Sequence, residues 1–142
     1  MQSLIEPNIH PILVHFTYAL TLTSLFCYLM SGFQFAERWR DSLRPAADWM
    51  LAFAALSVFA TIAAGFQAYY SVAHDGPSHA AMTTHRNWAV PSGMAVLLLG
   101  GWRWMRRENP ATLLFKSLMM ITAFSLTVTA WWGGNIVYNY GI

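Results

Sequence analysis

The sequence predicts an all-α integral membrane protein, a four-helix bundle in up-down-up-down order in which residues 1–142 form a single transmembrane domain. Three observations favour this fold class. The chain is 56% hydrophobic and only 10% charged, whereas about 25% of residues are charged in an ordinary soluble domain. Its apolar residues are gathered in four long runs, and its basic residues cluster at the ends of those runs. Together these features indicate that lipid is the solvent of the helices.

The four apolar runs each approach the roughly 20 residues that a helix needs to cross a bilayer. Pro11 suits the first turn of the first helix, and Gly32 provides a stop signal at its end. Proline also lies near the start of the second run and, after Asn109, of the fourth. Lipid offers backbone groups no hydrogen-bond partner, so each run is predicted to be helical, and short connections make consecutive helices antiparallel. The expected spans are residues 11–33, 45–73, 87–105 and 110–138.

Basic residues set the expected orientation. Seven of the eight Lys and Arg residues lie near the first and third connections: Arg38, Arg40, Arg44, Arg103, Arg106, Arg107 and Lys116. Only Arg86 lies near the second. Because cytoplasmic loops are enriched in Lys and Arg, both termini are expected on the periplasmic side of a bacterial inner membrane. The start of the chain lacks the basic region of a signal peptide, so the first helix is expected to remain in the mature multi-pass protein.

All the histidines fall at the expected periplasmic end: His10, His15, His74, His79 and His85. A simple explanation is that a loop poor in Lys and Arg tolerates imidazole, which is mostly neutral at pH 7. His15, however, lies about one turn inside an apolar run, where a polar ring without a partner is costly. His85, at the entrance to the third helix, is placed to meet His15 across the bundle.

Glycines on three helices recur at a similar depth. Gly65, Gly93, Gly133 and Gly134 lie roughly 6 to 14 Å below the outer surface at 1.5 Å per helical residue. Such room suits a porphyrin held by two axial imidazoles, although ordinary close packing of helices at glycine is at least as common.

These features favour a haem b-binding electron-transfer subunit of the cytochrome b kind. His15 and His85 are the expected axial ligands, His10 and His74 come next, and His79 comes last. The protein would exchange electrons between a periplasmic redox partner and membrane quinone. Membrane lipid and other subunits of a redox complex are its expected partners.

Two other functions fit the same sequence. A Cu or Zn site at the periplasmic face could use the imidazoles of His74, His79 and His85 and the carboxylate of Asp75. Alternatively, the chain is a structural or assembly subunit of a membrane complex, and its histidines are incidental. A catalyst acting alone is least expected, because no nucleophile–base pair or carboxylate pair is present in a suitable place. Nucleic acid is not an expected partner, since the basic residues form no continuous stripe.

Two motifs resemble those of a known family. Residues 10–16 (HPILVHF) are similar to the HPxxVHFP signature of a bacterial membrane family designated domain of unknown function 2231, and residues 133–138 (GGNIVY) are similar to its terminal GGxLVY. The four-helix layout and a histidine before the third helix, here His85, are also similar. Thr17 replaces the family's usual proline, and Tyr140 stands where a histidine often follows. The resemblance implies a fold and a histidine motif, while function has to be argued from the site.

Overall fold

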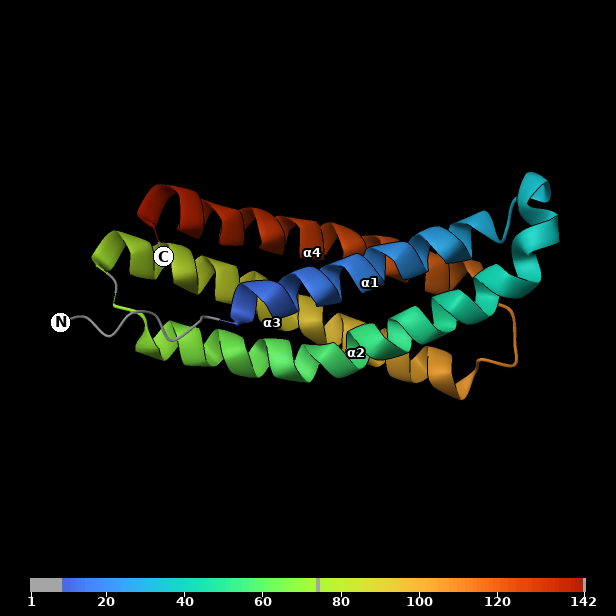
Figure 1. Ribbon diagram of the computed structural model, residues 1–142, viewed down its shortest axis with the longest axis horizontal. Helices are drawn as coiled ribbons and strands as arrows, with labels where there is room; N and C mark the ends of the chain where they lie inside the picture. Colours follow the sequence, from blue (N-terminus) through green and yellow to red (C-terminus); the bar gives the residue numbers. More distant parts are fainter. Residues whose placement is uncertain (1–8, 74, 142) are drawn as a thin grey trace.

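Four long helices make up most of the protein. The computed structural model describes residues 9–73 and 75–141. These residues form α1 (His10–Met30), a short 3-10 helix η1 (Gln34–Trp39), α2 (Arg40–Ser71), α3 (Gly76–Met105) and α4 (Leu113–Tyr140). Figure 1 shows the four long helices lying side by side, with the start of α1 and the end of α4 at one end of the bundle. The prediction of an all-α protein with four helices is confirmed.

The outside of the bundle is apolar. Within the described residues, three helical segments are long and apolar enough to cross a membrane: His10–Met30, Gln34–Ser71 and Leu113–Tyr140. Large apolar side chains cover their outward faces, among them Phe26, Phe59, Leu56 and Phe124, each more than half exposed. Such an exterior is suited to contact with lipid rather than with water.

α3 is less apolar than the other helices because it carries polar and small residues into the interior. Ser92, Gly93, Gly100 and Arg103 are all buried on this helix. At Gly100 a Cβ atom would lie 2.7 Å from the Cβ of Ala55 on α2. Glycine therefore lets the backbones of α2 and α3 approach closely, which is a common way of packing helices in membranes.

α3 also begins well before the expected start near Asn87. Asp75 caps the helix, because its Oδ1 accepts the backbone N–H of Ser78 at 2.9 Å, and a proline occupies the first turn, where its missing N–H is no loss. These first turns are polar, so hydropathy alone did not reveal them. The segment expected to be a loop is therefore helical, and both His79 and His85 lie on α3.

α4 and α2 start away from the expected positions too. The Oγ1 of Thr112 accepts the backbone N–H of Phe115 at 3.1 Å, so Thr112 caps α4, which starts three residues after the expected position 110. α2 begins at Arg40 and contains Pro45 inside the helix, where the proline ring removes one backbone hydrogen bond.

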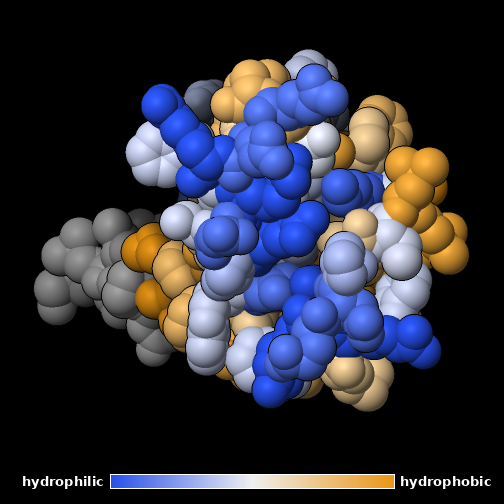
Figure 2. All heavy atoms as spheres, turned by 90° about the vertical axis from the view of Figure 1, so that its right-hand side faces the viewer, coloured by the Kyte–Doolittle hydropathy of each residue, from blue (hydrophilic) through white to orange (hydrophobic). Residues whose placement is uncertain are grey.

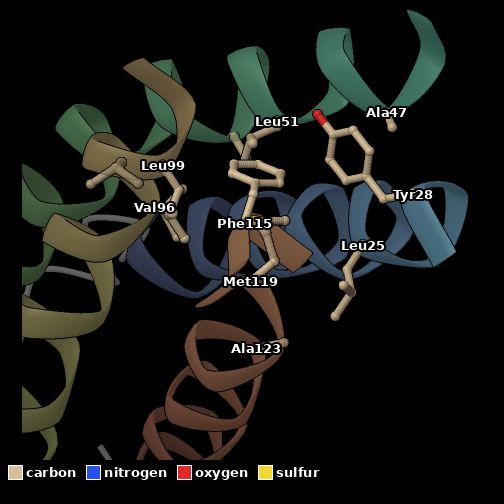
Figure 3. Packing of buried hydrophobic residues seen from close by; sticks show 11 residues of the cluster. Leu25, Tyr28, Ala47, Leu51, Val96, Leu99, Phe115, Met119 and Ala123 are labelled. Carbon is tan, nitrogen blue, oxygen red and sulfur yellow. The ribbon is translucent and has the colours of Figure 1, made fainter. Parts of the chain in front are cut away.

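The main apolar core occupies the half of the bundle where α1 ends and α2 begins. Figure 3 shows its side chains converging from all four helices. The larger side chains pack against small residues of α2, of which Ala47 and Ala54 are fully buried. The largest fully buried side chains in this core are Tyr28, Leu51, Met119, Val58 and Val96.

A buried ion pair lies next to this core. The Nε of Arg103 lies 2.6 Å from the Oδ1 of Asp48, and the hydroxyl of Tyr28 donates to the same oxygen at 2.6 Å. Arg103 also donates to backbone carbonyls of the loop that follows α3, at residues 106, 107 and 109. One charged cluster thus joins α1, α2, α3 and this loop.

Candidate functional site

Two histidine rings meet near the end of the bundle where α1 starts. His10 is the first residue of α1, and His85 lies in the third turn of α3. Because α3 starts further out along the bundle than α1 (Figure 1), the two rings reach the same depth. Their centroids are 6.1 Å apart and their planes are at 82°. Both residues are half-buried.

Each ring is held by a backbone carbonyl of the next helix in the sequence. The Nδ1 of His10 lies 3.1 Å from the carbonyl oxygen of Thr61 on α2, and the Nδ1 of His85 lies 3.0 Å from that of Thr129 on α4. A carbonyl oxygen can only accept, so Nδ1 is the donor in both rings. The lone pair of each neutral imidazole is then at Nε2, the tautomer that metal-binding histidines use with a carbonyl behind them.

Glycines make room for both rings. A Cβ atom at Gly65 would lie 2.9 Å from the Cε1 of His10, and one at Gly133 would lie 3.3 Å from the Cε1 of His85. A helical side chain covers the turn that precedes it. A glycine therefore leaves the carbonyl four residues earlier open to the imidazole.

Clusters of hydroxyl groups connect α1 to α2 and α3 to α4 by hydrogen bonds, about two turns further into the bundle than the two histidines. In both clusters the oxygen atoms are 2.6 to 3.3 Å apart: Thr17 with Ser57 and Thr61, and Ser92 with Ser125 and Thr129. The threonine that offers its carbonyl to the imidazole also belongs to the hydroxyl cluster.

These contacts form a local arrangement that occurs twice. In each copy a hydroxyl residue follows the histidine by seven positions, and on the neighbouring helix serine, threonine and glycine follow one another at intervals of four. The hydrogen bonds repeat with the spacing. The α1–α2 pair and the α3–α4 pair thus hold their histidines through the same local contacts, and the two imidazoles lie side by side.

The ring that His85 meets is that of His10, which corrects the expected pairing with His15. His15 is exposed, and its Nδ1 donates to the carbonyl of Pro11 in its own helix. It follows His10 by five residues, which places it about 140° further around the helix axis. When His10 faces the neighbouring helices, His15 therefore faces outward.

His79 lies apart from this pair. His79 is exposed on α3, and its Nε2 lies 3.3 Å from the hydroxyl of Tyr69. His74 lies outside the described residues. Among the residues that are described, no group of three or more His, Cys, Asp or Glu side chains is arranged to hold a metal ion.

The three predicted glycines have two different uses. Gly65 and Gly133 accommodate the imidazole rings. Gly93 does not: a Cβ there would lie 3.2 Å from Val58 Cγ1 and 3.3 Å from Ile62 Cδ1. It serves the packing of α3 on α2, the commoner use of glycine in such bundles.

Sequence reasoning missed the groups that hold the histidines. Thr61 and Thr129 act through their carbonyls, which every residue possesses, so residue type alone could not single them out. The repeated spacing of hydroxyl residues and glycine was the available signal. A comparison of the two halves of the sequence would have shown it.

A family model covers almost the whole chain. It is described as "Predicted membrane protein (DUF2231)" and matches residues 6–142. No curated protein and no solved structure matches the chain. The matched range includes the two segments 10–16 and 133–138, which supply His10 and Gly133 to the histidine pair. The chain therefore belongs to the DUF2231 family of membrane proteins.

Proposed function

We propose that this membrane protein is a haem b-binding electron-transfer subunit in which His10 and His85 would hold the haem. The observation that carries the proposal is the histidine pair itself: two rings from different helices lie with centroids 6.1 Å apart, and each is fixed through Nδ1 by a backbone carbonyl. Of the two ligands expected from the sequence, the proposal retains His85 and replaces His15 with His10.

The donor chemistry of the pair fits a haem. Two neutral imidazoles whose Nδ1–H groups are held by carbonyls would offer their Nε2 lone pairs to a haem iron. A fixed Nδ1–H donor raises the basicity of Nε2 and sets the orientation of the ring. Bound haem would supply one-electron redox chemistry. The role of the chain is to hold both rings in place through its carbonyls, its glycines and the hydroxyl clusters below them.

The distribution of charge supports a placement in a bacterial inner membrane. The four helices cross it up-down-up-down, and both termini and the histidine pair are periplasmic, since seven of the eight basic residues lie at the opposite end. No histidine in the sequence belongs to the half of the bundle that faces the cytoplasm. Electrons would therefore be exchanged near the periplasmic face, between membrane quinone and a periplasmic carrier or another subunit of a redox complex.

The absorption spectrum and the metal content of the purified protein test this function. We expect a Soret band, a sharpened α band on reduction, and about one haem b per chain, as for an iron with two imidazole ligands. Protein from cells supplied with a haem precursor that still has no Soret band would exclude the haem. Stoichiometric copper or zinc without porphyrin would instead support the metal-site alternative.

A further inference from the structure

A small polar cavity lies at the end of the bundle opposite the histidine pair. Its volume is about 40 Å³. All four helices reach it: Tyr28 from α1, Arg44 from α2, Arg103 from α3 and Lys116 from α4 line it, and Ser31 closes it after α1. Figure 2 views this end of the molecule and shows hydrophilic residues gathered across its middle, with hydrophobic residues at the margins.

The cavity has an excess of positive charge. The guanidinium of Arg103 is paired with Asp48, and all its N–H groups are used by that carboxylate and by the loop carbonyls. Arg44 and Lys116 are different. Within the described part of the chain, neither forms an ion pair or a side-chain hydrogen bond. Two cations from separate helices thus line one cavity with their donors available.

Lys116 reaches over the end of α1 to take this position. Its Nζ lies 3.4 Å from the place where a Cβ of Gly32 would be, and it is half-buried. A long flexible cation would gain more hydration by extending into water, so its position beside the cavity needs a compensating interaction. The partial negative charge of the carbonyl groups at the C-terminal end of α1 supplies part of this compensating interaction.

We propose that this cavity binds a phosphate group, which Arg44 and Lys116 hold by charge-assisted hydrogen bonds. A cavity of 40 Å³ has room for roughly three water-sized groups, enough for three of the four oxygens of a phosphate group. Basic pockets between transmembrane helices commonly bind the headgroups of anionic lipids. The phosphate can belong to such a lipid or be free inorganic phosphate, and an experiment can separate these two sources.

The test uses the full chain purified in an uncharged detergent. Its thermal stabilisation is titrated with phosphatidylglycerol, with phosphatidylcholine, and with inorganic phosphate against chloride at equal ionic strength. The test variant is Arg44→Gln with Lys116→Gln. The control variant is Arg38→Gln with Arg106→Gln, which removes the same charge from exposed residues at the same end that do not line the cavity. The two single cavity variants are measured as well, in case the double variant does not fold.

We expect the cavity variant to bind phosphatidylglycerol at least about thirtyfold more weakly than the wild type, because it removes two charge-assisted hydrogen bonds to the phosphate that the control variant keeps. The control variant should change the affinity less than about threefold. If phosphatidylglycerol stabilises the protein and inorganic phosphate does not, the source of the phosphate is a lipid. If inorganic phosphate also stabilises the protein, the cavity accepts the free anion. Equal losses of affinity in the cavity variant and the control variant, or no stabilisation by either phosphatidylglycerol or inorganic phosphate, would overturn the proposal.

Discussion

Replacement of either His10 or His85 by alanine is expected to abolish haem binding. The two rings come from different helices and lie side by side with centroids 6.1 Å apart, so neither can replace the other. Even partners that only hydrogen-bond to a metal ligand change metal affinity about 10- to 100-fold. The Soret absorbance per chain should therefore fall below roughly a tenth of the wild-type value in each single variant.

The matched controls are His15→Ala and His79→Ala. Both residues are exposed and lie away from the histidine pair, so these variants should keep the Soret band. Helicity measured by circular dichroism shows whether every variant is folded. An undiminished band in folded His10→Ala or His85→Ala, or its loss in His15→Ala, would contradict the ligand assignment.

Replacement of Asp48 by alanine is expected to cause the largest loss of stability. The side chains of Arg103 and Asp48 are only 7% and 13% exposed, so the variant leaves a buried guanidinium without its counter-charge. Removing one partner of a buried ion pair costs about 3–5 kcal/mol. The Tyr28 hydroxyl loses its acceptor as well. Unfolding of the purified protein by a denaturing detergent, followed by tryptophan fluorescence, measures the change.

Asp41→Ala is the matched control for this prediction. Asp41 is exposed in the first turn of α2, where its charge contributes at most about 1 kcal/mol through the helix dipole. If Asp48→Ala and Asp41→Ala lower the free energy of unfolding equally, the pair with Arg103 does not stabilise the bundle as described here.

The sequence was sufficient to predict the four helices because their apolar runs are long and bounded by proline, glycine and basic residues. It was insufficient where polar residues extend a helix. The first turns of α3 look like a loop by hydropathy, yet the Asp75 cap and the proline after it start a helix there. This shift places His85 inside α3, where its ring can lie next to that of His10.

The histidine pair could be predicted only in part. That imidazoles gather at one end follows from the sequence, but which ring faces inward depends on the rotation of α1. His10 and His15 lie about 140° apart on the helix, and only the contacts with α2 select between them. Hydropathy favoured His15 because it lies deeper in the apolar run, whereas the room at Gly65 favours His10. The purpose of each glycine likewise depended on which neighbour it met.

Electron paramagnetic resonance of the oxidised protein tests most directly whether His10 and His85 hold one haem between them. The repeated arrangement, with an Nδ1 donor fixed in each ring, predicts a low-spin ferric signal with two imidazole ligands in the wild type, and the loss of that signal when either histidine is replaced. A high-spin signal in the intact protein, or a low-spin signal that survives replacement of both histidines, would contradict the account.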